Sequence, residues 1–316
     1  MKQDFNICGL SPAPGEKISD YVQVGQVCSM PVTVINGAGR GKTLLITAGI
    51  HGGEYPGIQT ATELAQEVDP GKIRGQIVIV HCVNTAAFYQ RVSYISPLDG
   101  KNINRLFPGD AGGSAGDQTA RFLTENFHKK ADFYLDLHGG DIHEKLPPYV
   151  YCPSVGEDKR VLETARKAAE YINAEYMVMS TATTGAYNSR AILGIPSLLL
   201  ERGGQGQWSR RQVDRYKEDV INIMRFLGMV DEKPVLPQKP AVVLQEVVYL
   251  DSDLDGCWYA CADIREKVEK GQRIGYIRDI FGNVIKEYYA EFDAVVLYVA
   301  ISLAITKGTR IITYGR

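Results

Sequence analysis

Apolar runs of strand length alternate with helical segments over most of the chain, and this alternation limits the fold more than any other feature. A run such as TLLITAGI at 43–50 suits a strand that is covered on both faces. Strands that alternate with helices indicate a largely parallel sheet. Further strands are expected at 21–27, 31–36, 76–83, 132–137 and 197–200, and helices at 58–68, 117–129 (capped by Asp117), 158–173 and 212–227. We therefore predict an α/β fold with a mixed, largely parallel central sheet flanked by helices.

The pattern changes at 231–240, where the segment DEKPVLPQKP contains three prolines. Prolines at this density make a stiff linker. Beyond it the chain has short β-type runs and glycine turns, without helical periodicity. We therefore predict two domains, an α/β domain over 1–232 and a small all-β domain over 233–316.

The composition excludes several classes of protein. The 316 residues carry a formal net charge of −2, and 45% are hydrophobic, which is typical of globular proteins and gives no field that attracts nucleic acid or acidic membranes. No apolar run reaches the roughly 20 residues of a membrane helix, and the first residues do not resemble a signal peptide. We expect a cytoplasmic protein without nucleic-acid or membrane partners, and the sequence leaves homo-oligomerisation open.

The six cysteines are scattered and mostly lie in apolar segments. In a reducing compartment we expect them to be buried thiols rather than disulfides. Cys257 and Cys261 form a C-x-x-x-C pair, but no second pair follows at zinc-ribbon spacing. A structural zinc site is therefore not expected there.

Residues suited to metal binding or acid–base chemistry follow three of the predicted strands. His51 and Glu54, in the motif HGGE, come directly after 43–50. His138 comes directly after 132–137, and Glu201 directly after IPSLLL. Ligands of open α/β sheets bind outside the carboxyl ends of the strands, so these side chains have a reason to meet.

Two histidines and one carboxylate bind zinc and leave one position for water. We predict that His51, Glu54 and His138 hold one Zn²⁺ per chain, which makes hydroxide available near neutral pH. Glu201 is then the catalytic carboxylate that takes the proton of the water and returns it to the leaving nitrogen. Asp136 lies two residues before His138, hence on the same face of the strand, and is expected to orient the imidazole.

Each of these residues also has a purely structural interpretation. HGGE alone is a weak match, His138 alone could be a satisfied buried histidine, and Glu201 alone could be an ion-paired carboxylate. Their coincidence at three strand ends favours the metal site. The other histidines are expected to be structural: His81 in the core, His128 on a solvated helix end, and His143 without a constrained place.

The turn-rich segment at 99–109 places Arg105 beside Asn104. A guanidinium with a neighbouring amide can form a fork for a substrate carboxylate or carbonyl. The alternative is an arginine that ties down its own loop. We predict that Asn104 and Arg105 bind substrate.

Four motifs together resemble the succinylglutamate desuccinylase/aspartoacylase family, whose fold is that of the zinc carboxypeptidases. They are G-x-H-G-x-E, N-x-N-R-x-F-P-G, D-L-H and L-L-E-x-G, in the family's order, from about residue 43 to residue 204. The resemblance implies a zinc hydrolase that removes an acyl group from an N-acyl amino acid or a related amine. It assigns His51, Glu54 and His138 as zinc ligands and Glu201 as general base.

The resemblance also implies roles in substrate binding. Asn104 and Arg105 match the pair that holds a substrate carboxylate, and Arg190 resembles a second carboxylate-binding arginine. Tyr187 is expected to supply a hydroxyl near the leaving group. Aspartoacylase-type members carry an arginine shortly before the N-R pair that polarises the scissile carbonyl; here Arg91 is the nearest candidate, and this departure argues against N-acetylaspartate as substrate.

The segment VEKGQRIGYIRDIFGN at 268–283 resembles half of a biotinyl/lipoyl-type β-sandwich, without the attachment lysine between methionines. We predict a β module with no covalent cofactor. Packing or oligomerisation is its expected role, and a lid over the zinc site is the alternative.

The sequence therefore predicts a zinc-dependent deacylase that cleaves the amide bond of a small N-acyl amino acid or N-acyl diamine. A metallocarboxypeptidase acting on peptides is the first alternative. A non-catalytic zinc- or ligand-binding protein is the second, and it is less favoured because structural zinc sites are usually closed by four protein ligands.

Overall fold

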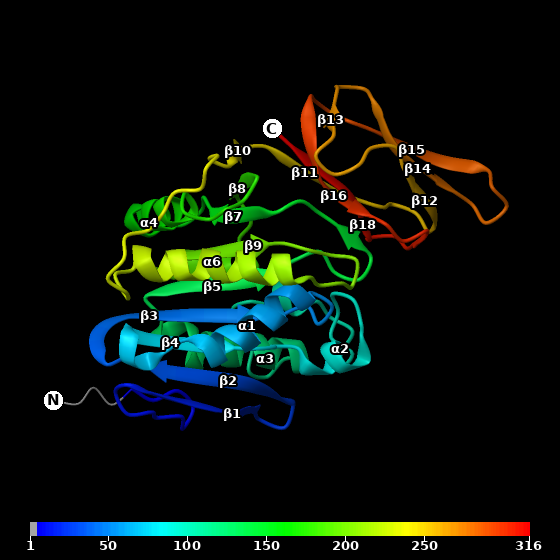
Figure 1. The fold of residues 1–316 in the computed structure, drawn as a ribbon. Coiled ribbons are helices and arrows are strands. Elements are labelled where there is room, and N and C mark those ends of the chain that lie inside the picture. The colour runs from blue at the N-terminus through cyan, green and yellow to red at the C-terminus, as the bar shows by residue number, and fades with distance from the viewer. Residues whose placement is uncertain (1–4) are drawn as a thin grey trace.

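The computed structural model describes residues 5–316, and one large mixed sheet runs through its N-terminal part (Figure 1). The outer strands on one side are antiparallel, whereas β4, β3, β5 and β9 at the centre are mutually parallel. In spatial order the strands are β1 (Glu16–Val24), β2 (Cys28–Asn36), β4 (Arg74–Val80), β3 (Gly39–Ala48), β5 (Phe133–His138), β9 (Ser197–Glu201), β7 (Tyr149–Pro153), β8 (Tyr176–Ser180) and β10 (Val242–Leu244).

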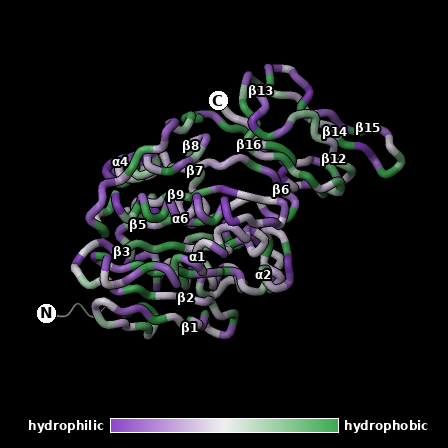
Figure 2. The backbone as a smooth tube through the Cα atoms, in the orientation of Figure 1, coloured by the Kyte–Doolittle hydropathy of each residue, from purple (hydrophilic) through white to green (hydrophobic). Residues whose placement is uncertain are grey.

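Helices cover both faces of this sheet, as continuous apolar strands require. Helices α1 (Tyr55–Glu67), α4 (Lys159–Ala169) and α6 (Arg210–Phe226) pack on one face, and α3 (Ala115–Asn126) and α5 (Ala186–Ile192) pack on the other. Figure 2 shows hydrophobic residues running through the strands between these helix layers. The short helix α2 (Thr85–Gln90) and the 3-10 turns η1 (Pro70–Lys72), η2 (Ile103–Arg105) and η3 (His128–Lys130) lie between the larger elements.

The C-terminal part consists of two small antiparallel sheets around their own apolar core. Gly275 shows how tightly this core is packed, because an added Cβ would lie 2.0 Å from the Trp258 ring. The first sheet contains β11 (Val247–Asp251), β18 (Arg310–Gly315), β16 (Ala294–Ala300) and β13 (Lys267–Val268), and the second contains β15 (Val284–Tyr289), β14 (Arg273–Arg278), β12 (Gly256–Ala260) and β17 (Ala304–Ile305).

Two strands connect the parts of the molecule. Strand β6 (Glu144–Lys145) leaves the large sheet region and pairs with β16 of the C-terminal part. Strand β10 lies beyond the proline-rich linker, yet it pairs in parallel with β8 and completes the large sheet. The two parts therefore share backbone hydrogen bonds across the predicted boundary.

The predicted fold class is confirmed: the sheet is mixed and largely parallel, helices flank it, and antiparallel β structure follows. One helix begins earlier than expected, because Ser114 rather than Asp117 is the N-terminal cap. Asp117 instead occupies the third helical position, where its carboxylate accepts the Ser114 backbone N–H and completes a capping box. Within residues 5–316 no helix is long and apolar enough to cross a membrane.

Three further sequence-based predictions are wrong in detail. His128 does not lie on a solvated helix end but is completely buried against the Tyr134 ring, because η3 turns its side chain into the core. The six cysteines are unpaired, but only Cys82 and Cys152 are buried. His81 does not lie in the core as predicted but just past the end of β4, half-buried, with its Nε2 atom 2.7 Å from the Thr33 hydroxyl.

Candidate active site

The functional side chains meet at the carboxyl ends of three adjacent strands. His138 is the last residue of β5, and Glu201 ends β9 in register with it. Because paired residues of neighbouring strands point to the same face, the two side chains lie next to each other. His51 and Glu54 follow β3, the other neighbour of β5, in the turn that leads into α1. The predicted convergence is therefore present.

His51, Glu54 and His138 form a compact buried cluster whose potential ligand atoms all lie within 4.8 Å of one another. The His51 Nδ1 atom is 2.7 Å from one Glu54 oxygen, and the His138 Nδ1 atom is 3.0 Å from the other. Glycine is required at position 53 of the turn, because a Cβ there would lie 1.9 Å from an Asp141 carboxylate oxygen. The HGGE motif thus brings both imidazoles onto one carboxylate.

An oxygen acceptor faces the outer nitrogen of each imidazole. His51 Nε2 lies 3.0 Å from the side-chain oxygen of Asn102, and His138 Nε2 lies 3.1 Å from Asp136 Oδ2. The contact between His138 Nε2 and Asp136 Oδ2 is short enough for a hydrogen bond but poorly aligned, because neither atom has a hydrogen bond of good geometry. Both acceptors favour the tautomer with the proton on Nε2, which leaves the Nδ1 lone pairs directed at the centre of the cluster.

The buried carboxylate of the cluster favours the binding of a cation. Burial alone would raise the pKa of Glu54, but His138 and His51 lower it to about 2. Burial would lower the pKa of both histidines, but Glu54, together with Asp136 at His138 and Asp141 at His51, outweighs this effect and raises the pKa of each. One Glu54 oxygen, Oε2, is buried without a hydrogen bond. Two imidazole nitrogens and a carboxylate that converge in this way match the ligand set of a zinc ion, so the residues fit such a metal.

Glu201 lies beside this cluster without belonging to it. Burial raises the pKa of Glu201 well above its ordinary value, and the Glu54 carboxylate adds to this effect, whereas His138 opposes it. Glu144 is a second, half-buried carboxyl near the site, and desolvation raises its pKa to about 7. Carboxyl groups with raised pKa values in a cleft are candidates for proton transfer near neutral pH.

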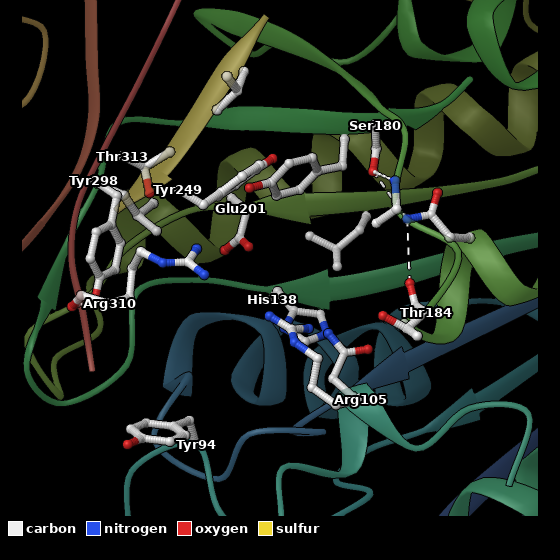
Figure 3. Close-up of a pocket in the computed structure, with 18 of the residues that line it drawn as sticks. Tyr94, Arg105, His138, Ser180, Thr184, Glu201, Tyr249, Tyr298, Arg310 and Thr313 are labelled. Atoms are coloured by element: carbon white, nitrogen blue, oxygen red, sulfur yellow. Dashed lines mark hydrogen bonds between the residues drawn. The ribbon is translucent and has the colours of Figure 1, made fainter. Parts of the chain in front are cut away.

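A cavity of about 630 Å³ opens in front of the cluster and Glu201. Figure 3 shows side chains from both parts of the molecule facing it. The N-terminal part contributes a polar wall with four tyrosines, formed among others by Tyr94, Asn102, Asn104, Arg105, Glu144, Tyr149, Tyr151 and Tyr187. A volume of this size is in the range of small-molecule sites.

The C-terminal sheets form the opposite wall, which the sequence did not reveal. Arg310 on β18 pairs with Asp251 on β11 and lies 5.0 Å above the Tyr249 ring. In Figure 3 the Arg310 side chain extends into the pocket toward Glu201. Tyr298 on β16 donates a hydrogen bond to Glu144 at 3.1 Å. Only the clustering of aromatic and charged residues in short strands could have indicated this wall.

The predicted substrate-binding residues fall into two groups. Asn104, Arg105 and Tyr187 line the pocket, and Arg105 projects toward it with no hydrogen bond or ion pair to another described residue (Figure 3). Arg91 and Arg190 are not among the lining residues. Arg91 is exposed at the end of α2, and Arg190 lies on α5 and is buried, with 1% of its surface exposed. The structure therefore does not bring these two arginines to the site.

The fold and site define an α/β protein with a His/Glu/His cluster and a separate glutamate at the carboxyl edge of its sheet. The model of the succinylglutamate desuccinylase/aspartoacylase catalytic domain matches residues 40–227, which is more than half of the chain. The chain belongs to the succinylglutamate desuccinylase/aspartoacylase family, as its four motifs predicted.

Relatives with similar sequences and structures support this assignment. The chain is 29% identical over 274 residues to N-alpha-acetyl-L-2,4-diaminobutyric acid deacetylase of Halomonas elongata, covering 84% of this chain and 79% of the relative. A product-bound structure of the ectoine utilization protein EutE (DoeB) from Ruegeria pomeroyi superposes with a TM-score of 0.81 at 26% identity, covering 91% and 89% of the two chains. The crystal structure of a succinylglutamate desuccinylase/aspartoacylase from Rhodobacter sphaeroides superposes with a TM-score of 0.81 at 25% identity, covering 95% of each of the two chains.

Proposed function

We propose that this protein is a zinc-dependent deacylase that hydrolyses the amide bond of a small N-acyl amino acid or N-acyl diamine. The observation that carries the proposal is the position of Glu201, in register with His138 and outside the His51/Glu54/His138 cluster. A carboxylate next to a metal site, yet not part of it, is what amide hydrolysis needs in addition to the metal. The named relatives remove acetyl or succinyl groups.

His51, Glu54 and His138 would hold the zinc ion through the two Nδ1 atoms and the carboxylate. Bound zinc supplies Lewis acidity and lowers the pKa of water to about 7. Glu201 accepts the proton of the attacking water and donates it to the leaving nitrogen. Desolvation of its carboxyl raises the pKa of Glu201, which suits the second of these steps.

The pocket carries charges of both signs at the places where a substrate would extend. The unpaired guanidinium of Arg105, beside Asn104, suits a carboxylate, and its planar fork can bind both oxygens. Glu144 adds an acidic group to the lining, and Asp251 on the opposite wall is paired with Arg310. This arrangement favours a substrate with a carboxylate and a second amine, such as N-acetyl-2,4-diaminobutyrate. Residues 233–316 would then act as a domain that forms part of the substrate site rather than as packing alone.

The first test replaces Glu201 by glutamine. We expect kcat to fall about 100- to 10,000-fold, because a general acid–base group is lost, while the zinc content stays at the wild-type value. His138→Ala should lose zinc and turnover together, and exposed Glu157→Gln is a matched control that should behave as wild type. Full activity of Glu201→Gln would contradict the proposed mechanism, and a wild-type protein that neither contains nor responds to zinc would contradict the metal site.

A substrate panel decides between the proposed activity and cleavage of peptides. It contains N-acetyl-2,4-diaminobutyrate, N-acetylaspartate, N-succinylglutamate and C-terminal dipeptides. We expect turnover of the diaminobutyrate derivative and none of the dipeptides. Preferred hydrolysis of dipeptides would instead support a carboxypeptidase.

Arg105→Met tests how the carboxylate is held. Loss of a charge-assisted hydrogen bond costs about 1.5 to 3 kcal/mol, which corresponds to a rise in KM of roughly 10- to 100-fold. A matched substrate in which the carboxylate is replaced by a carboxamide should be bound equally weakly by both proteins. Equal KM values of the two proteins for the acid would show that Arg105 does not bind this group.

A further inference from the structure

A row of buried polar side chains leads from the core of the sheet to His138. Tyr134, Asp136 and His138 alternate along β5 and therefore point to the same face. Thr47 on β3 is in register with Asp136. Its hydroxyl lies 2.6 Å from the Tyr134 hydroxyl and donates to Asp136 Oδ1 at 2.7 Å. The other oxygen of Asp136 lies 3.1 Å from His138 Nε2, so the row ends at the imidazole.

The number of available protons fixes the direction of these hydrogen bonds. A hydroxyl group has one proton to donate. Thr47 donates its proton to Asp136 and must therefore accept the hydrogen bond from Tyr134. Burial and the Asp136 carboxylate raise the pKa of Tyr134 well above its ordinary value, so this proton remains in place. Both O–H dipoles point toward Asp136 and stabilise the negative charge that faces His138 Nε2.

Arg190 adds a positive charge at the other end of the row. Its side chain is almost completely buried, and neither its Nε nor its Nη2 atom has a hydrogen-bond partner among residues 5–316. A buried guanidinium without an ionic partner is costly. Arg190 acts on Tyr134, whose pKa it lowers against the larger effects of burial and Asp136. Burial lowers the pKa of Arg190, and Tyr134 and the Glu125 carboxylate oppose this effect.

The buried row is defined as Arg190, Tyr134, Thr47 and Asp136. We propose that the buried row positions the His138 imidazole for metal binding, by holding it in the tautomer whose Nδ1 lone pair faces the metal site. Thr47 and Tyr134 are then positioning residues, which act only through Asp136. Arg190 likewise acts indirectly, through Tyr134, and does not contact the substrate. The inference rests on the proposed zinc site.

The test measures the zinc affinity of the full-length metal-free protein by competition with a chelating dye. Substitution of groups that orient a metal ligand typically lowers metal affinity about 10- to 100-fold. We expect Thr47→Val to weaken zinc binding about tenfold and Tyr134→Phe to weaken it less. Thr47→Ser keeps the hydroxyl and should therefore bind zinc with the wild-type affinity. Thr43→Val is the matched control, because Thr43 is a buried threonine of the same strand whose hydroxyl bonds Gln76 instead.

The outcomes separate the inference from the proposed function. Weakened binding in Thr47→Val and Tyr134→Phe, with unchanged affinity in Thr47→Ser and Thr43→Val, supports the buried row. Wild-type affinity in a folded Thr47→Val or Tyr134→Phe overturns it, as does an equal loss in the Thr43→Val control. If the wild-type protein binds no zinc at all, the metal site itself is wrong, and the buried row loses its proposed purpose.

A double-mutant cycle tests the part played by Arg190. Arg190→Met and Tyr134→Phe are compared singly and together for their effect on the thermal unfolding midpoint of the metal-free protein. Interacting residues give non-additive effects. We expect the double variant to lose less than the sum of the two single losses. Additive losses would show that Arg190 does not interact with Tyr134 and does not belong to the buried row.

Discussion

Asp219→Asn is the substitution whose effect on stability follows most directly from the structure. Asp219 on α6 and Arg202, which follows Glu201 at the end of β9, form a buried ion pair with an Nη2–Oδ2 distance of 2.6 Å. The other Asp219 oxygen accepts the backbone N–H of Asn173 at 2.8 Å. The pair thus joins helix α6 to the strand that carries the proposed catalytic carboxylate.

The magnitude follows from what asparagine keeps and what it loses. Its side-chain oxygen can still accept the Asn173 N–H, and Arg202 keeps the Asn173 carbonyl and the Tyr216 ring, whose centre is 5.2 Å away. The guanidinium, however, remains buried without a counter-charge. Breaking a buried pair in this way costs about 3 to 5 kcal/mol, and the retained contacts favour the lower end. We therefore expect a loss of about 3 kcal/mol in the free energy of unfolding.

Urea denaturation of the full-length protein measures this loss. With a denaturant dependence of about 3 kcal/mol per M, the unfolding midpoint should fall by roughly 1 M. Asp214→Asn on the same helix is the control, since its contacts with Arg210 and Lys217 are long and partly exposed. Arg202→Met in the Asp219→Asn background should restore part of the stability by removing the unpaired charge. A loss below about 1 kcal/mol, or fully additive losses, would refute the reasoning.

Two further predictions concern the turn at the site and the stability in acid. Gly53→Ala should lower kcat/KM about 100-fold, since its Cβ would lie 1.9 Å from an Asp141 carboxylate oxygen and displace the turn that holds two proposed metal ligands. Gly112→Ala is the control and should have no effect, because its Cβ would meet only an Asp110 oxygen at 3.8 Å, an ordinary contact. Equal activity of both variants would contradict this prediction. Hydrogen bonds from Arg210 lower the pKa of Glu63 to about 2, against 4.5 for the free group. The ion pair of Glu63 therefore stabilises the fold above about pH 4.5 and loses this effect as the pH falls toward 2. The difference in the free energy of unfolding between wild type and Glu63→Gln should narrow between about pH 5 and pH 3. A difference that stays constant over this range would contradict the prediction.

The sequence predicted most of the large sheet because its strands are continuous apolar runs whose burial needs helices on both faces. It failed where local pattern and tertiary contact disagree. The polar neighbours Lys129 and Lys130 suggested a solvated His128, yet the backbone turn at η3 buries that ring completely. Strand β10 follows a proline-rich linker and was assigned to the β module, but its backbone pairs with β8. Hydrogen-bond partners across long distances leave no trace in local composition.

The candidate site shows the same division. His51, Glu54, His138 and Glu201 could be recognised because each follows a strand directly, and parallel strands bring their carboxyl ends to one edge. Arg190 could not be placed by motif, since its nearness to the substrate-binding pair depends on which way α5 turns. In the structure Arg190 is a buried residue of α5 and does not line the pocket.

The sequence by itself determined the class of fold, the metal-type cluster and the family, because these depend on periodicity and on residues fixed at strand ends. Only the tertiary structure decided what completes the site. Arg310, Tyr249 and Tyr298 stand more than a hundred residues beyond His138 in the chain, yet they form the far wall of its pocket. Their placement arises from the packing of the C-terminal sheets on the large domain, through β6 and β16, and packing between distant surfaces is not encoded in any local pattern.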